Sequence, residues 1–420
     1  MTQAAVSFQP FEPSFALDPY PAYAELRSAV PVEEHEFGFW ALWRHADVSE
    51  LLRSRMSVED RNVTTFSPMR GLYEEIYREA ERSRRGGGLS MLDRDPPDHT
   101  RLRKLVSKAF TPRTVDALAP MVEQLVAQSL DRIAEEHEVN LIDALAFPLP
   151  FAVISAMLGM PEHDVPRLRE LSAMIVRSLE PVPDEDTVRA IIAAETEMSD
   201  RTTEAIAWKR EHPADDLLTG LINVHDGEDA LSDDELVSQV ILLYVAGHET
   251  TVNLIGNGTR ALLDHPDQAE ILRQDPSLDD NAVEELLRYD SPVQLSRRIT
   301  IEDYATPAGV IPTGRVVLAS LASANRDESV FGPDAGRVRL DRPNAKQHLS
   351  FGGGVHHCLG SSLARLEGRA AITKLFRRFP RLTLTGVPDY NGRSSLLGLT
   401  RLRVSLDRAR GDGRKSGRPA

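Results

Sequence analysis

One long helical pattern dominates the sequence, and any fold open to this chain must accommodate it. The segment LSDDELVSQVILLYVAGHETTVNLIGNGTRALLDHP opens with a capping box, in which Ser232 precedes Glu235 by three residues, and it stops before Pro266. A helix over 232–264 would be roughly 50 Å long at about 1.5 Å per residue, enough to cross a whole domain. The stretch 240–246 is apolar nearly all round, so we expect the helix to be buried.

A polar insertion, GHETT at 247–251, interrupts the apolar part of this helix. A glycine inside a helix costs about 1 kcal/mol relative to alanine, and buried polar groups cost more unless they are hydrogen-bonded. One interpretation is a kink in which the threonine hydroxyls bond back to helix carbonyls. The other is functional, because Glu249 and Thr250 together can pass protons to a molecule bound beside the helix. A zinc-hydrolase H-E-x-x-H motif is excluded, since Val252 stands where its second histidine would be.

The other periodic segments are also mostly helical. Strand-like runs such as FGFWALW (37–43) and RVVLASL (315–321) are short and few, and no repeat or low-complexity linker divides the chain. We therefore expect one domain over 1–408, mainly α with small β-sheets, followed by a mobile basic tail at 409–420. A connection at 60–90 is either a surface loop or a functional lid. The remaining expected helices cover about 114–136, 148–160, 163–179, 186–211, 279–289 and 358–378.

The composition excludes several classes of protein. Hydrophobic residues make up 41% of the chain and charged residues 27%, which is ordinary for a folded globular protein. A net charge of -15 argues against a nucleic-acid binder, whose surface is usually basic. No apolar run reaches the roughly 18 residues of a membrane span, and the N-terminal segment lacks a signal-peptide pattern. We expect a cytoplasmic monomer that binds neither nucleic acid nor a membrane.

The single cysteine, Cys358, lies in the loop FGGGVHHCLG (351–360), directly before a helical pattern. The N-terminus of that helix favours a thiolate, and the glycines let the backbone curl around the sulfur. A phosphate loop is disfavoured because no Lys-Ser or Lys-Thr follows the glycines. A cysteine hydrolase would need His356 or His357 as its base, an awkward geometry for such close neighbours. A thiolate ligand to heme iron explains the glycines, the helix end and a shielding Phe351 together.

Three patterns, in this order along the chain, resemble the cytochrome P450 family. An acid-alcohol pair after A-G-x on the central helix of that family is matched by AGHETT at 246–251. Its E-x-x-R motif is matched by Glu285 and Arg288, which by spacing alone would be an exposed pair worth about 0.2 to 0.5 kcal/mol. In the family this pair is buried and braces the region beneath the heme. The signature F-G-x-G-x-H-x-C-x-G is met in full by Phe351, Gly352, Gly354, His356, Cys358 and Gly360.

The resemblance implies a cytochrome P450 fold with heme b between the long central helix and the cysteine-loop helix. Cys358 would be the iron ligand, Ala246 would lie against the heme, and Gly247 would leave the helix groove open for O2 and substrate. The segment DPPDHTRLRKLV (95–106) is similar to the helix that contacts the heme propionates, and charge-assisted bonds from Arg and His suit such carboxylates. The implied propionate partners are His99, Arg103, Arg298 and His356, with Arg297 as the substitute for a register shifted by one.

The activity that the resemblance implies is insertion of one atom of O2 into a largely apolar small molecule. Thr250 and Glu249 would deliver the protons, and hydroxylation in secondary-metabolite tailoring or catabolism is the favoured reaction. Epoxidation and oxidative aryl or C-C coupling are alternatives on the same iron. A peroxide-driven enzyme or a heme sensor would not need the acid-alcohol pair. Electrons would come from NAD(P)H through a ferredoxin reductase and a ferredoxin.

Two surfaces follow from the same resemblance. A basic patch near the propionate helix, formed by Arg101, Lys104, Lys108 and Arg113, is either a docking site for an acidic ferredoxin or a solvated helix face. The substrate pocket would be lined by the 60–90 connection, the central helix, the segment after the E-x-x-R helix and a segment near the C-terminus. The pocket residues would be Leu242, Leu243, Ala246, Val293, Leu295, Ser395, Leu396 and Leu397.

Overall fold

The computed structural model describes residues 6–9, 12, 15, 17–64, 90–160, 165–180 and 185–406. Most of the expected 60–90 connection and all of the expected tail therefore lie outside the described residues. Within them helices predominate and strands are two to five residues long, so the expected class, mainly α with small sheets, is confirmed. The helices of at least eight residues are α2 (Tyr20–Ala29), α3 (His45–Arg53), α5 (Asp98–Ala109), α6 (Pro112–Ile133), α7 (Pro148–Leu158), α8 (Val165–Ile175), α9 (Glu185–Glu211), α11 (Asp233–Asp264), α12 (Pro266–Gln274), α13 (Asp279–Tyr289) and α16 (Ser361–Arg378).

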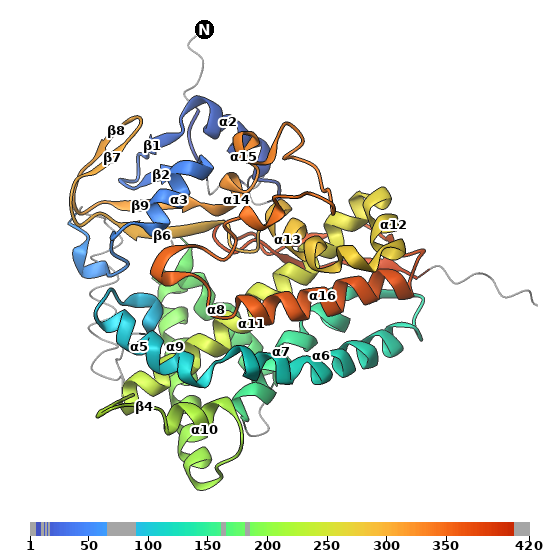
Figure 1. Ribbon diagram of the computed structural model, residues 1–420, viewed down its shortest axis with the longest axis horizontal. Helices are drawn as coiled ribbons and strands as arrows, with labels where there is room; N and C mark the ends of the chain where they lie inside the picture. Colours follow the sequence, from blue (N-terminus) through green and yellow to red (C-terminus); the bar gives the residue numbers. More distant parts are fainter. Residues whose placement is uncertain are drawn as a thin grey trace, which may run out of the picture.

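Helix α11 has the boundaries that its capping signals predict. The Ser232 hydroxyl accepts a hydrogen bond from the Glu235 amide at 3.2 Å, and the Glu235 carboxylate accepts one from the Ser232 amide at 2.9 Å. The helix runs without a break through the polar insertion at 247–251. Helix α11 packs against α7, α9, α13 and α16. Figure 1 shows α16 lying between α13 and α6.

Among the residues that the structure describes, the strands form one mixed sheet and four smaller ones. The two strand-like runs of the sequence are neighbours, because β2 (Trp40–Leu42) pairs in parallel with β9 (Val316–Ser320). Antiparallel edges β1 (Val32–Glu34) and β6 (Leu295–Ile299) complete the order β1-β2-β9-β6. One of the smaller sheets has three strands, β3 (Glu138–Asn140), β10 (Thr383–Leu384) and β13 (Arg403–Ser405). The others are two-stranded: β4 (His225–Asp226) pairs with β5 (Asp229–Ala230), β7 (Tyr304–Thr306) with β8 (Gly309–Ile311), and β11 (Asp389–Tyr390) with β12 (Leu399–Arg401).

The mixed sheet and the helices occupy different ends of the molecule. In Figure 1 the mixed sheet lies at one end of the molecule together with α2, α3, α14 (Leu321–Ala324) and α15 (Glu328–Phe331). Helices α5 to α9 and the short helix α10 (Leu217–Ile222) lie at the other end. The largest hydrophobic cluster joins α6, α7, α11 and α16, and a separate aromatic cluster packs Phe8, Tyr23 and Trp43 against the sheet. The cysteine loop precedes α16, with Gly354 against the end of α3 and Phe351 against α11 and α13.

One carboxyl group in the helical core has unusual surroundings. Glu367 on α16 is 1% exposed, and its Oε2 has no hydrogen-bond partner among the described residues. Burial raises the pKa of this carboxyl well above its usual value. Because the pKa is higher in the folded than in the unfolded chain, folding takes up a proton at neutral pH, and the free energy of unfolding falls as the pH rises above about 4.5.

Glu367→Gln is therefore expected to be more stable than the wild type at pH 8 by an amount of order 1 kcal/mol. The difference should vanish below pH 4, where both chains carry a neutral group at this position in both states. Denaturant unfolding followed at several pH values measures it. Parallel stability profiles for the two proteins would show that burial does not perturb this carboxyl.

Candidate active site

The cysteine loop is closed by its own backbone and held against α3. The Cys358 amide donates to the Phe351 carbonyl at 2.9 Å. Gly354 has φ +66°, and a Cβ there would lie 2.4 Å from the Leu52 carbonyl oxygen at the end of α3. Only glycine permits that conformation together with that approach. Helix α16 begins three residues after the cysteine, at Ser361, with Gly360 as its N-cap.

The sulfur of Cys358 is accessible at the surface of the loop. Burial by the surrounding protein nevertheless raises the pKa of the thiol, while the Gly360 amide and then Arg103 and Arg365 act to lower it. The helix N-terminus thus stabilises a thiolate as expected, but desolvation outweighs it in the protein alone. A bound metal cation would reverse the balance, since a coordinating thiol is deprotonated outright.

One stripe of α11 is accessible although most of the helix is buried. Ala246 is exposed, and Leu242 and Thr250, one turn before and after it, are half-buried. The Thr250 hydroxyl donates to the Ala246 carbonyl at 2.8 Å, and Thr251 donates to Gly247 at 3.3 Å. The hydroxyls thus bond back to helix carbonyls, and the helix continues through both residues.

Gly247 lies against another helix. A Cβ at this position would be 3.3 Å from Ile154 Cδ1 on α7. The missing side chain therefore allows α11 and α7 to pack closely. That Gly247 leaves the helix groove open for O2 and substrate stays a prediction.

The acid of the acid-alcohol pair has a partner that the sequence does not indicate. Glu249 Oε1 accepts a hydrogen bond from Arg393 Nη1 at 2.8 Å, and the two side chains are 15% and 14% exposed. Neighbouring His248 is fully buried against Phe147 and Phe151, and burial lowers its pKa to about 4. Glu249 is thus held by a distant arginine while the adjacent histidine is neutral near pH 7.

Two arginines and two histidines gather beside the cysteine loop. The rings of His99 and His356 are 4.3 Å apart, and both nitrogens of His99 are buried with no hydrogen-bond partner among the described residues. Burial, followed by His99, Arg298 and Arg103, lowers the pKa of His356 to about 3. Burial also lowers the pKa of Arg298 to about 10. In the described part of the chain none of the four has a carboxylate at ion-pair distance, so the cluster fits an anionic group such as the two propionates of heme.

The structure distinguishes the two arginines between which the sequence left the register open. Arg298 is 5% exposed and donates to the Ser296 hydroxyl at 3.1 Å and to the Arg297 carbonyl at 2.7 Å. Arg297 is exposed and forms an ion pair with Asp60 at 2.5 Å. Because side chains alternate along β6, only Arg298 turns into the site. Arg103 reaches it from α5 and donates to the His357 carbonyl at 2.6 Å.

Beneath the loop, the E-x-x-R pair belongs to a larger buried network. Glu285 accepts hydrogen bonds from Arg288 at 2.6 and 2.8 Å, and both side chains are fully buried. Arg342, which sequence reasoning missed, adds contacts at 3.1 Å to both oxygens of the same carboxylate. Arg288 also donates to the carbonyls of Asn325, Ala335 and Arg337. The network thus ties α13 to the long connection that leads to the cysteine loop.

A second network holds the start of the loop. Glu284 accepts from His348 Nε2 at 2.9 Å and from Arg365 Nε at 2.8 Å. Burial opposes ionisation of Glu284, but these two partners lower its pKa to about 2. The Arg365 guanidinium also lies 4.4 Å above the ring of Phe351, which packs against Leu254 of α11 and two residues of α13. Phe351 therefore anchors the loop to the core.

The expected pocket residues divide into two groups. Leu396 forms a β-bridge with Val293, and Ser395 accepts from the Gln294 amide at 2.9 Å, so two of the expected lining segments lie side by side. Leu295 is wrong as a pocket residue, because it is buried in the aromatic cluster with Tyr23 and Trp43 on the other side of the sheet. Leu243 and Leu396 are buried in the main core, and Leu397 and Ser395 are also buried.

The basic patch on α5 is largely neutralised by acidic residues nearby. Lys104 and Lys108 both pair with Asp226 on the β4-β5 hairpin. Arg101 pairs with Asp229 of the same hairpin and with Glu235 of α11. The sequence indicated unpaired positive charge on this helix. It could not show that acidic residues more than a hundred positions later lie beside the helix and pair with that charge.

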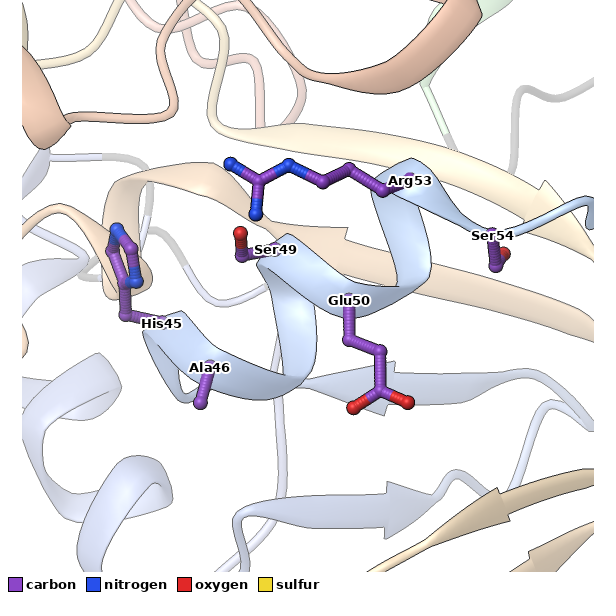
Figure 2. A pocket seen from close by; sticks show the side chains of 6 residues that line it. All are labelled: His45, Ala46, Ser49, Glu50, Arg53 and Ser54. Atoms are coloured by element: carbon purple, nitrogen blue, oxygen red, sulfur yellow. The ribbon is translucent and has the colours of Figure 1, made fainter.

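A shallow surface groove of about 600 Å³ runs along α3 and is lined by His45, Ala46, Ser49, Glu50, Arg53 and Ser54 (Figure 2). Figure 2 shows Arg53 and Ser49 on one side of the helix and Glu50 on the other. The end of α3 contacts the cysteine loop, where Gly353 would place a Cβ 3.3 Å from Leu52. None of the expected site residues lines the groove.

Comparison with known proteins agrees with this geometry. The family model described as cytochrome P450 matches residues 67–404. Cytochrome P450 107B1 of Saccharopolyspora erythraea is 42% identical over 389 residues, covering 90% of this chain and 92% of that protein. 6-Deoxyerythronolide B hydroxylase of the same organism is 38% identical over 407 residues, covering 94% and 97%. The structure of cytochrome P450 PksS of the bacillaene polyketide synthase from Bacillus subtilis 168 matches with a TM-score of 0.84 at 34% identity, covering 96% and 100%.

A mainly helical fold with an accessible loop cysteine, braced from below and flanked by arginines and histidines that have no carboxylate partner among the described residues, is the arrangement of a heme-thiolate protein. The chain belongs to the cytochrome P450 family, and it is a monooxygenase of that family. This excludes the phosphate loop and the cysteine hydrolase that the loop sequence had left open. In the described part of the chain, none of the helices combines the length and apolar character needed to cross a membrane.

Proposed function

We propose that this monooxygenase hydroxylates a largely apolar small molecule in the tailoring of a secondary metabolite, as a single domain over residues 1–408. The observation that carries the heme site is the cluster of two arginines and two histidines beside the accessible Cys358, none of which has a carboxylate partner among the described residues. The substrate class is supported by two relatives, one named for hydroxylation of 6-deoxyerythronolide B and one for a polyketide synthase. Electrons are proposed to come from NAD(P)H through ferredoxin reductase and ferredoxin.

Each site residue then has a defined task. Heme, when bound, supplies the activation of O2 and the acceptance of electrons. Cys358 would hold the iron, and the Gly360 amide and the N-terminus of α16 stabilise the negative charge on its sulfur. His99, Arg103, Arg298 and His356 would bind the two propionates, the arginines through their charge and the histidines through ring N–H groups.

Proton delivery would fall to α11. The Thr250 hydroxyl lies on the accessible stripe and donates its proton to the Ala246 carbonyl. To donate toward the site it must rotate, and the Ala246 carbonyl then keeps the backbone hydrogen bond of the helix. Glu249 would return the proton to Thr250 from solvent.

The test of the proposed function is the absorption spectrum of the purified, reduced protein exposed to carbon monoxide. A strongly red-shifted Soret band is expected from iron ligated by a thiolate. A band at the position typical of histidine-ligated heme, or no heme at all, would contradict the assignment of Cys358. A shift of the resting absorption spectrum when candidate apolar compounds are added then identifies the substrate class.

Thr250→Ala is expected to lower the product formed per O2 consumed by at least tenfold, with peroxide released instead, because a general acid contributes about 10² to 10⁴ in rate. Thr251→Ala is the matched control, since Thr251 is 3% exposed and makes the same type of bond to a helix carbonyl. Both ratios are measured with an oxygen electrode and product analysis. Coupled turnover unchanged in Thr250→Ala would remove Thr250 from the mechanism.

A further inference from the structure

The segment between β11 and β12 contains an arginine that joins two helices of the site. Arg393 Nη1 donates to Glu249 Oε1 on α11 at 2.8 Å, and Nη2 donates to the Ala173 carbonyl on α8 at 3.0 Å. Ala173 lies in the last turn of α8, where carbonyls lack partners within the helix and the helix dipole is negative. One guanidinium therefore satisfies two negative groups from elements far apart in the sequence.

The two residues after Arg393 are fastened to the same end of α8. Glu180 accepts hydrogen bonds from the Ser394 amide at 2.9 Å, the Ser394 hydroxyl at 2.7 Å and the Ser395 amide at 3.1 Å. The Ser395 hydroxyl donates to the Leu179 carbonyl at 2.8 Å. The guanidinium of Arg393 is thus carried by a short segment that is itself fixed to the 3-10 turn after α8.

The ion pair leaves part of Glu249 available. Among the described residues, Arg393 is the one ion-pair partner of this carboxylate, and the contact uses Oε1. Adjacent His248 is neutral near pH 7, because burial lowers its pKa to about 4, so it supplies no counter-charge. Both side chains of the pair are about 15% exposed, which keeps the carboxylate within reach of water.

We propose that Arg393 is a positioning residue for the acid of the proton relay. It holds the Glu249 carboxylate in one orientation, and it makes that orientation depend on the docking of α8 against α11. This inference rests on the proposed function, in which Glu249 passes protons toward Thr250. A carboxylate fixed at one oxygen loses less rotamer freedom when it transfers a proton from the other.

The central experiment is a double-mutant cycle between Arg393 and Glu249, read out as product formed per O2 consumed. Arg393→Gln is expected to lower this ratio on the order of tenfold in the wild-type background and to have no further effect in Glu249→Ala. Arg393→Lys should restore most of the ratio, because a lysine retains the charge. Arg260→Gln is the matched control, since Arg260 pairs with Asp264 on the same helix at 2.7 Å, away from the insertion.

A loss as large in Glu249→Ala as in the wild type would overturn the proposal, because Arg393 would then act through another group. An unchanged ratio in Arg393→Gln would overturn it as well. These outcomes differ from failure of the proposed function, which the carbon monoxide spectrum of the wild type decides independently.

A second measurement does not depend on turnover. Amide hydrogen exchange on the full chain is expected to accelerate at 173–180 and 391–397 in both Arg393→Gln and Glu249→Ala, and to stay at the wild-type rate in Arg260→Gln. Unchanged exchange at 173–180 in Glu249→Ala would show that the acid is not connected to the position of α8.

Discussion

Replacing Cys358 with serine should abolish the red-shifted Soret band of the reduced, carbon monoxide-treated protein and reduce monooxygenase turnover to the background. A serine hydroxyl has almost the same volume but stays protonated at neutral pH, so it is a weak ligand and pushes no electron density onto iron. The loop should survive the change, because its closing bond joins the backbone atoms of residues 358 and 351. Far-ultraviolet circular dichroism and the spectrum together separate loss of the ligand from loss of the fold.

This variant also tests the alternatives that the loop sequence left open. Cys358 is the only cysteine of the chain, so all thiol chemistry disappears with it. His357→Ala is the matched control, since this exposed neighbour bonds Arg103 through its backbone carbonyl, which alanine retains. A red-shifted band that persists in Cys358→Ser would mean that another residue ligates the iron.

The largest effect on stability is expected for Glu285→Ala. The change removes the carboxylate that pairs with the buried guanidiniums of Arg288 and Arg342 and accepts from the Arg339 amide at 2.8 Å, and it leaves Arg342 with Asp334 as its ion-pair partner. Breaking a buried ion pair by removing one partner typically costs about 3 to 5 kcal/mol, because the remaining charge stays buried and unpaired. Denaturant unfolding, followed by circular dichroism, measures the loss, and heme content should fall with it because the network supports the cysteine loop.

Glu185→Ala is the control for this prediction. Glu185 and Arg189 form an exposed i,i+4 pair on α9, and such pairs contribute only about 0.3 to 0.5 kcal/mol. A loss of equal size in the two variants would show that the Glu285 network has no special structural role. A large loss in Glu285→Ala alone would place the brace beneath the loop among the main determinants of stability.

Sequence reasoning succeeded where the signal is local. The capping box at Ser232 and Glu235 defines where α11 begins, because each group reaches its partner within one helical turn. The spacing of Glu285 and Arg288 likewise brings the two side chains onto one helix face. The cysteine loop was recognisable because its glycines, its sulfur and the following helix are consecutive in the chain.

Sequence reasoning failed to predict contacts where a residue's surroundings come from distant segments of the chain. Leu295 was placed in the pocket, yet the sheet turns it toward Trp43. The lysines of α5 were taken as free charge, although the β4-β5 hairpin neutralises them. Nothing near Arg342 or Arg393 in the sequence marks them as partners of Glu285 and Glu249.

The sequence by itself thus determined the helical class, the central helix and the loop that presents the cysteine. Only the tertiary structure decided which charges are paired, which face of β6 meets the site and which residue holds the acid of α11. The physical reason lies in separation along the chain. Helix caps and i,i+3 pairs are set by the fixed geometry of one turn, whereas the contact between Glu249 and Arg393 spans 144 positions and exists only because the chain folds back on itself.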